Sequence, residues 1–209
     1  MARLLTVVAA IALLLVMGVS SAAPIPEGAR PAPLYHATGV GATNTYRWHH
    51  GGEFSDTVAA VEDHRGVKRV TYRRLAKSER FPQPPITFKV EVSPAGVRVT
   101  DIVGGSAWRN RMAYWSFQPH QARWQYVSST PWERATHTVT SFPPERVAVP
   151  AGTFDAVRVH DVWAYDAEGF GPQEQTEWWA PGVGVVKMLY QDHNGTESFV
   201  LKSFTRGDR

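Results

Sequence analysis

The sequence predicts an all-β protein, a single domain of about ten antiparallel strands that form a curved sheet or an open, half-closed barrel. Three observations indicate this fold. Apolar and polar residues alternate with a period of two through most of the chain after residue 34. Turn signals recur roughly every 8–12 residues, which is typical of meandering β-sheets. After residue 23 no segment keeps a sustained apolar stripe of helical period, apart from a weak one over residues 104–116.

The first half of the domain contains the clearest alternation. Three strands are expected there, over residues 43–50, 67–75 and 86–92. In the third, Phe88, Val90 and Val92 fall on one side of the strand. The turn Ser93–Gly96 then leads into Val97, so a hairpin is expected at this point.

The second half reads as further strands with proline-rich interruptions. Residues 135–165 are strand-like but are expected to break at Pro143-Pro144 and again at Pro150. Residues 183–191 and 196–204 flank Asn194-Gly195. Because Asn-Gly favours the two central positions of a tight hairpin turn, these two residues are expected to form it.

The amino-terminal 22 residues have the features of a cleavable signal peptide. Arg3 provides the positive start, and Leu4 to Met17 form an apolar run of 14 residues. Such a run spans about 21 Å as a helix, short of the roughly 30 Å core of a bilayer. Ser20-Ser21-Ala22 supplies the small residues that signal peptidase needs, and a cut after Ala22 is favoured over one after Ala23, because Pro24 would then follow the scissile bond. Residues 23–34, which contain four prolines, are expected to form an extended lead-in to a β-rich exported domain at 35–209.

Composition removes several classes of function. The chain has no cysteine, which excludes thiol catalysis, thiolate zinc sites and a lipid-anchored cysteine. Loss of Arg3 lowers the formal net charge from +3 to +2. Basic residues gather only between residues 65 and 80, and a solvated hairpin face explains that run, so no nucleic-acid partner is expected. No cofactor is indicated, no membrane span is expected after processing, and the sequence leaves the oligomeric state open.

Neither a metal site nor a catalytic set is evident. His49, Glu53 and His64 lie near one turn but lack the spacing of a metal motif, so no metal is expected. The chain has no Gly-x-Ser-x-Gly motif, and Ser128 has no obvious base or orienting partner. The carboxylate pairs Asp161/Asp166 and Glu174/Glu177 are possible acid–base groups, but surface carboxylates explain them as well. We therefore expect the domain not to be an enzyme.

Tryptophan is abundant, with eight in the chain. Such rings fill cores by default, but they also line apolar grooves and form platforms on which sugars stack. In the adjacent pair Trp178-Trp179, alternation places one ring on each face of a strand. The candidate residues for a ligand-binding groove are Trp108, Trp115, Trp124, Trp132, Trp178 and Trp179.

Two motifs in the second half resemble a known family. VPAGTF stands at residues 149–154 and WWAPGVGVVK at residues 178–187. They resemble the carboxy-terminal pattern VPAGTF…WYAPGVGLVK of uncharacterised exported bacterial β proteins, among them the TapB-like family, over roughly residues 145–204. Trp179 stands where tyrosine is usual. The resemblance implies a strongly curved antiparallel sheet akin to the half-barrels of periplasmic lipoprotein carriers, and it implies no activity.

These observations favour an exported, periplasmic or secreted, non-catalytic domain that binds or carries an apolar or amphipathic molecule such as a lipid of the cell envelope. The first alternative is a protein that binds polysaccharide on an aromatic platform. A carboxylate-dependent hydrolase is the second. An exposed row of tryptophan faces would favour the polysaccharide, and a polar pocket with converging titratable groups would favour the enzyme.

Processing is directly testable. Export should yield a mature chain that begins at Ala23, because Ala22 supplies the small residue at the cleavage position. The intact mass of the exported protein measures this. A full-length chain that stays in the membrane would show that residues 4–17 act as an anchor.

Overall fold

The computed structural model describes residues 33–77, 85–103, 116–129, 134–166 and 171–208. Contacts divide the chain into two units, Met1–Pro31 and Ala32–Arg209, and all described residues belong to the second. The proposed signal peptide and most of the lead-in lie outside the described residues. So do three of the candidate groove residues, Trp108, Trp115 and Trp132.

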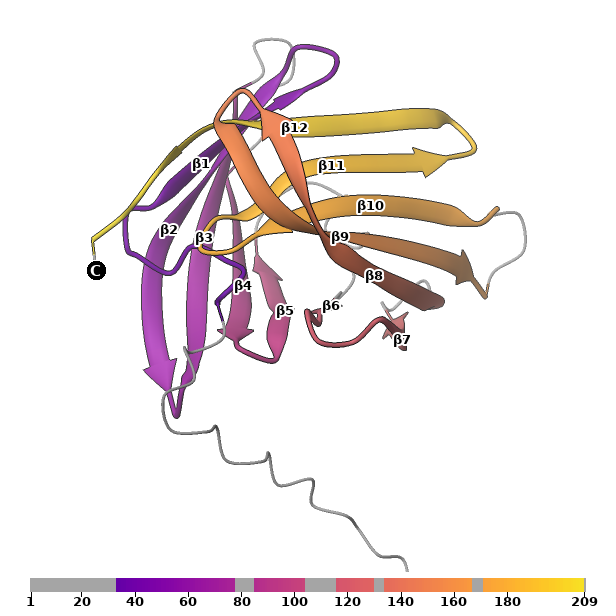
Figure 1. Ribbon diagram of the computed structural model, residues 1–209, viewed down its shortest axis with the longest axis horizontal. Helices are drawn as coiled ribbons and strands as arrows, with labels where there is room; N and C mark the ends of the chain where they lie inside the picture. Colours follow the sequence, from indigo (N-terminus) through magenta and orange to yellow (C-terminus); the bar gives the residue numbers. More distant parts are fainter. Residues whose placement is uncertain (1–32, 78–84, 104–115, 130–133, 167–170, 209) are drawn as a thin grey trace, which may run out of the picture. The chain divides into compact units, whose positions relative to one another are not determined.

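Twelve strands form one antiparallel sheet, which confirms the predicted all-β, single-domain fold (Figure 1). No helix occurs among the described residues, and so none there is long and apolar enough to cross a membrane. The strands are β1 (Thr43–Trp48), β2 (Glu53–His64), β3 (Val67–Lys77), β4 (Ile86–Ser93), β5 (Gly96–Val103), β6 (Ser116–Phe117), β7 (Arg123–Ser129), β8 (Arg134–Val149), β9 (Gly152–Tyr165), β10 (Gln173–Ala180), β11 (Gly184–Asp192) and β12 (Gly195–Thr205).

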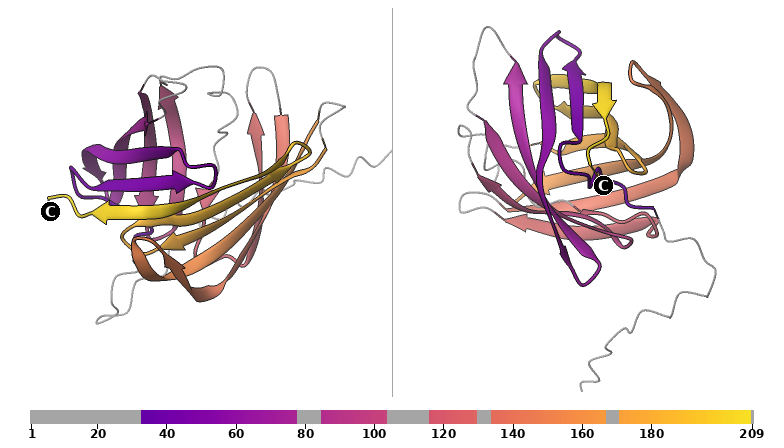
Figure 2. Two further views of the ribbon diagram at one scale, coloured as in Figure 1. Left: turned by 90° about the horizontal axis from the view of Figure 1, so that it is seen from above. Right: turned by 90° about the vertical axis from the view of Figure 1, so that its left-hand side faces the viewer.

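The order of the strands explains why the sheet curls. It runs β6-β5-β4-β3-β2-β1-β12-β11-β10-β9-β8-β7, so β6 and β7 are its two edges. These edges are consecutive in sequence, with only residues 118–122 between them. A link of that length reaches at most roughly 20 Å. The edges must therefore approach each other, and the sheet bends into an open, strongly curved form (Figure 2).

One end of the inner face is filled by a packed apolar core. Val70 and Val90, from one half of the sheet, belong to the same buried cluster as Val139 and Val159 from the other half. Because side chains from distant strands meet there, this face is the concave one. The segment before β1 joins the cluster, and the ring of Tyr35 packs edge-on against Phe117 with centroids 4.9 Å apart.

The break expected at Pro150 is confirmed, because Pro150 and Ala151 form the turn between β8 and β9. The break expected at Pro143 and Pro144 was wrong, because β8 continues through both prolines. Its register shifts between Ser141 and Pro144, so Phe142 and Pro143 together oppose Arg158. Such a bulge tolerates a proline within a sheet. Beyond it the tip reaches β12, where the Ala151 amide donates to the Leu201 carbonyl at 3.1 Å.

Three hairpin turns share one design. Ser93–Gly96, Val149–Gly152 and Asp192–Gly195 each place a paired residue, two turn residues and then a glycine with a φ of 145°, 131° and 137° respectively. A glycine in the last position is typical of a type I turn. The last hairpin is therefore confirmed, but its central residues are His193 and Asn194. Asp192 causes the shift, because its Oδ1 accepts a hydrogen bond from the Asn194 amide at 2.7 Å.

The turn glycines give a stability prediction. Gly195→Val should lower the free energy of unfolding by about 1–2 kcal/mol, because its positive φ resists a β-branched residue. Gly96→Val should lower it further, since any Cβ there would also overlap the carbonyl oxygen of Phe117. Urea denaturation measures both. Gly171→Val is the control, because Gly171 has open space around it and no positive φ. Equal stability of all three variants would contradict the turn geometry.

Candidate functional site

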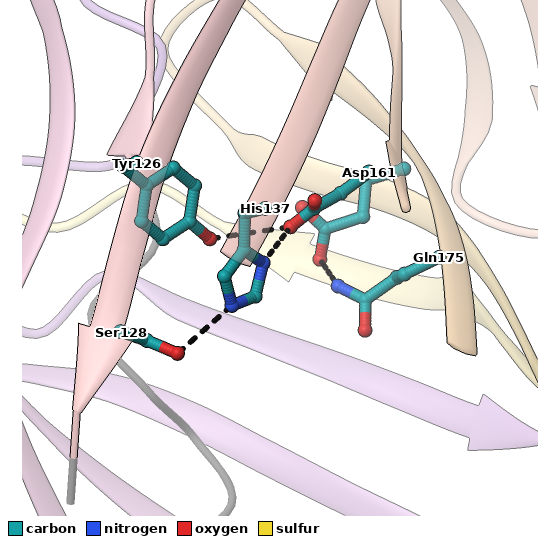
Figure 3. Close-up of polar contacts among 6 residues, drawn as sticks. Tyr126, Ser128, His137, Asp161 and Gln175 are labelled. Atoms are coloured by element: carbon teal, nitrogen blue, oxygen red, sulfur yellow. Dashed lines mark hydrogen bonds and ion pairs between the residues drawn. The ribbon is translucent and has the colours of Figure 1, made fainter. Parts of the chain in front are cut away.

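Polar side chains gather on the inner face of β7, β8, β9 and β10, beside the apolar core (Figure 3). Tyr126 on β7 lies opposite His137 on β8, and Val139 lies opposite Asp161 on β9. Paired residues point to the same side of a sheet, and so do residues two apart on one strand. The register therefore brings Ser128, His137 and Asp161 together on the concave side.

These three residues form a continuous chain of hydrogen bonds. Ser128 Oγ lies 2.9 Å from His137 Nε2, and His137 Nδ1 lies 2.9 Å from Asp161 Oδ2. Ser128 and His137 are 4% and 6% exposed. When Nδ1 carries the proton and donates it to the carboxylate, Nε2 is free to accept the serine hydroxyl. This is the arrangement of a nucleophile, a general base and the group that orients the base.

Asp161 is held by a second donor and also keeps one atom unsatisfied. The Tyr126 hydroxyl donates to Asp161 Oδ2 at 3.2 Å. Burial raises the pKa of Tyr126 well above its ordinary value, and the Asp161 carboxylate adds to the effect, so the phenol stays protonated. Asp161 Oδ1 is buried and has no hydrogen-bond partner among the described residues.

A protonated carboxyl group lies next to Asp161. Burial raises the pKa of Glu177 to about 8, and the neighbouring Asp161 carboxylate contributes to the increase. Hydrogen bonds oppose it: Glu177 Oε2 accepts from Trp179 Nε1 at 3.0 Å, and Oε1 accepts from Gln175 Nε2 at 2.8 Å. Glu177 therefore carries a proton at neutral pH, which avoids two adjacent charges in a buried site.

An ion pair occupies the inner face on the other half of the sheet. Arg74 on β3 donates from Nε and Nη2 to the two carboxylate oxygens of Asp56 on β2, both at 2.7 Å. The guanidinium also lies over the rings of Phe54 and Phe88, at 4.6 and 5.2 Å from their centroids. The positive charge of Arg74 lowers the pKa of Glu177, so the ion pair on this half of the sheet interacts electrostatically with the carboxyl group on the other half. Two hydrogen bonds and two rings compensate the burial of this charge.

Aromatic rings stack across the strands at the site. The rings of Tyr126 and His137 lie 4.3 Å apart, those of His137 and Trp163 5.4 Å, and those of Trp163 and Tyr190 5.9 Å. Neighbouring planes differ by 9°, 21° and 28°. We call these four residues the aromatic row. Because neighbouring rings cover one another's faces, a ligand above the row would meet ring edges.

Solvent reaches this end of the inner face. Along β9, Val157 and Val159 are buried, whereas Asp161 and Trp163 are partly exposed. The apolar surface continues sideways from the row, since Met188 pairs with Phe199 and Phe199 pairs with Trp48. Trp48 and Phe199 are themselves only partly buried. One end of the concavity is therefore packed, and the other presents aromatic surface beside buried carboxyl groups.

The three described tryptophans that were expected to line a groove lie away from the aromatic row. Trp124 and Trp179 are 8% and 1% exposed and belong to the packed core, so they offer no open ring to a ligand. Trp179 stacks on Phe117 at 5.0 Å. Trp178 points to the opposite face of β10, as alternation requires. There its Nε1 donates to Glu145 and the ammonium of Lys187 lies 4.6 Å from its ring centroid.

The carboxylate pairs suggested by the sequence are not brought together. Asp166 lies 3.6 Å from Arg134, and Glu174 lies 3.0 Å from His160 on the face opposite Glu177. The neighbours are Asp161 and Glu177, one from each suggested pair. The sequence also missed His137 as the partner of Ser128. The alternation of Val157, Val159, Asp161 and Trp163 was a usable signal, but only strand register shows what they face.

The histidines near the first turn do not form a metal site. Glu53 and His64 stand at opposite ends of the 12-residue strand β2, roughly 35 Å apart. His49 and His50 lie 3.6 and 3.8 Å from Glu197 instead. Among the described residues, no group of three or more histidine, aspartate or glutamate side chains is placed to hold a metal ion.

The fold is similar to that of two solved bacterial proteins. The chain matches a protein from Parabacteroides distasonis classed as a lipoprotein, at 14% identity and a TM-score of 0.61, over 84% of this chain and 100% of that one. It also matches a protein from Bacteroides fragilis classed as exported, with a YmcC-like fold, at 12% identity and a TM-score of 0.56, over 83% of this chain and 100% of that one. At such identities the likeness establishes the fold alone. No family model and no curated protein matches the chain.

Glu177 makes stability depend on pH. Folding raises its pKa from 4.5 to about 8, so between these values the folded state keeps a proton that the unfolded state releases. This contribution is complete below pH 4.5 and is lost as the pH rises through 8. Between pH 5 and 9 the wild type should therefore lose roughly 1–4 kcal/mol more stability than Glu177→Gln.

The free energy of unfolding in urea, measured from pH 5 to pH 9, tests whether the wild type loses more stability than Glu177→Gln as the pH rises. The readout is the difference in slope, because the substitution itself changes hydrogen bonds to Gln175 and Trp179. Glu62→Gln, at an exposed glutamate on β2, should follow the wild-type curve. Parallel curves for wild type and Glu177→Gln would show that Glu177 is charged in the folded protein.

Proposed function

We propose that the chain is an exported protein whose domain binds an apolar or amphipathic molecule at the solvent-reached end of its inner face. The observation that supports this proposal is the aromatic row. Its members Tyr126, Trp163 and Tyr190 are partly exposed, whereas the other end of the concave face is a packed core. Apolar surface held in a concavity is the usual form of a site for small apolar ligands. An acyl chain gains about 0.8 kcal/mol per buried methylene, so it would bind without a charged clamp.

Ring orientation favours this ligand class over a polysaccharide. Sugars stack on exposed ring faces, but the faces within the aromatic row are covered by neighbouring rings. The ring edges of the row and the neighbouring apolar side chain of Phe199 are suited to contact a flexible acyl chain. The polar groups beside the row, Ser128 and Asp161, suit the polar end of an amphipathic molecule.

Export is the second part of the proposal. The signal peptide predicted at residues 1–22 supports it, and so does the description of both similar structures as a lipoprotein or an exported protein. Membership of the TapB-like family and the absence of catalysis remain predictions from the sequence.

Ligand binding should change tryptophan fluorescence in a residue-specific way. Addition of a long-chain fatty acid or a lysophospholipid should quench the fluorescence of the mature protein and raise its melting temperature by a few degrees. Trp163→Phe should lose a clear part of the quenching, because Trp163 lies in the row. Trp178→Phe is the matched control, since Trp178 faces the other side of the sheet.

The same titration distinguishes the alternatives. Soluble oligosaccharides should neither quench the fluorescence nor raise the melting temperature. A response to oligosaccharides without one to lipids would replace the proposal with polysaccharide binding. Equal quenching in wild type and Trp163→Phe would place the ligand away from the row.

A further inference from the structure

We infer that Ser128, His137 and Asp161 form a catalytic triad that cleaves a carboxylic ester in an amphipathic acyl ligand. The substrate class rests on the proposed function, because the ester must lie over the aromatic row. The reactivity of Ser128 rests on the triad geometry alone. The inference goes beyond binding and opposes the expectation from the sequence that the domain is not an enzyme.

The geometry meets the requirement for an activated serine. Both hydrogen bonds are 2.9 Å long and engage opposite nitrogens of one imidazole ring. Catalytic hydrogen bonds of this kind measure roughly 2.6–3.2 Å. Tyr126 and Trp163 stack on His137, one on each neighbouring strand, so the ring cannot turn away from either partner. The base is therefore held in the orientation that the reaction needs.

A purely structural role explains this cluster poorly. A buried polar network stabilises a fold when every member is satisfied, and an unsatisfied buried carboxylate oxygen costs stability. Asp161 Oδ1 is buried and has no partner among the described residues, and it lies beside a carboxyl group that is kept neutral at Glu177. An apolar pair at these positions would fill the same space without that cost. Buried groups retained at a cost to stability are typical of functional sites.

The reaction balances without a cofactor. Ser128 Oγ attacks the carbonyl carbon of the ester while His137 Nε2 takes the hydroxyl proton, and Asp161 stabilises the resulting imidazolium. The carbon–oxygen bond to the alcohol breaks, and His137 returns the proton to the leaving oxygen. Water then attacks the acyl-serine with His137 again as base, which releases the carboxylic acid and restores Ser128. One ester and one water give one acid and one alcohol.

The position of β7 provides donors for the oxyanion. β7 is an edge strand of the sheet, and among the described residues it pairs with β8 alone. An edge strand leaves every second backbone N–H without a partner in the sheet. Such amides next to a nucleophile are suited to stabilise the charge that develops on the carbonyl oxygen. Tyr126 belongs to the aromatic row and lies two residues before Ser128 on β7, so the row lies directly beside the nucleophile.

Covalent labelling tests the triad independently of the natural substrate. An alkyl fluorophosphonate, followed by intact mass, should add one label to the mature protein and to Ser203→Ala, an exposed serine on β12. Ser128→Ala should take up none. Hydrolysis of a p-nitrophenyl acyl ester should fall roughly 10²–10⁴-fold in Ser128→Ala and Asp161→Asn. Melting temperatures near that of the wild type confirm that the variants are folded.

The outcomes separate this inference from the proposed function. Lipid quenching without labelling of Ser128 would overturn the triad and leave the binding site in place. Labelling of Ser128 by a short-chain probe, without any lipid response, would support the triad and overturn the lipid site. Labelling that persists in Ser128→Ala would place the reactive group elsewhere and overturn the triad.

Discussion

The pairing of β1 with β12 is the constraint on which the rest of the structure depends. Every other pairing in the sheet joins strands that are neighbours in sequence, and such hairpins form locally. Among the described strands, only β1 and β12 join the two ends of the domain, with Thr43 opposite Thr205, and the bridge between Val40 and Asp208 extends this contact. Without it the chain would hold two six-stranded meanders, β1–β6 and β7–β12, each with an exposed apolar face. With it they become one sheet whose halves bury those faces against each other.

This closure brings buried charge as well as apolar packing. The inner face carries Asp56 and Arg74 from one half and Asp161 and Glu177 from the other, and all four are removed from most solvent. The structure compensates each in a different way. Arg74 and Asp56 pair through two hydrogen bonds, Glu177 retains its proton, and Asp161 accepts from His137 and Tyr126. Only in the last arrangement does a carboxylate oxygen, Asp161 Oδ1, have no partner among the described residues.

The fold could be predicted from the sequence because its signals are local. The alternation of Phe88, Val90 and Val92 and the glycine that ends each hairpin turn are visible within ten residues. The candidate site is not local: Ser128, His137 and Asp161 lie on three strands, and each looks unremarkable in its own segment. The strand break predicted at Pro143 and Pro144 was also wrong because of a non-local feature. The bulge that tolerates these prolines forms against the partner strand β9. Residue type predicted strands, whereas register decided which side chains meet.

The core and the candidate site share the same strand faces, which determines how rigid the site is. On β9, Val157 and Val159 lock the inner face into the core, and the next inner residues, Asp161 and Trp163, belong to the site. On β10 the buried Trp179 holds Glu177 by a hydrogen bond. The position of each polar group is thus fixed by apolar packing one or two residues away, as a preorganised site requires. The polar groups of the inner face keep their positions without disulfides, because the packed half of the concavity stabilises the open half.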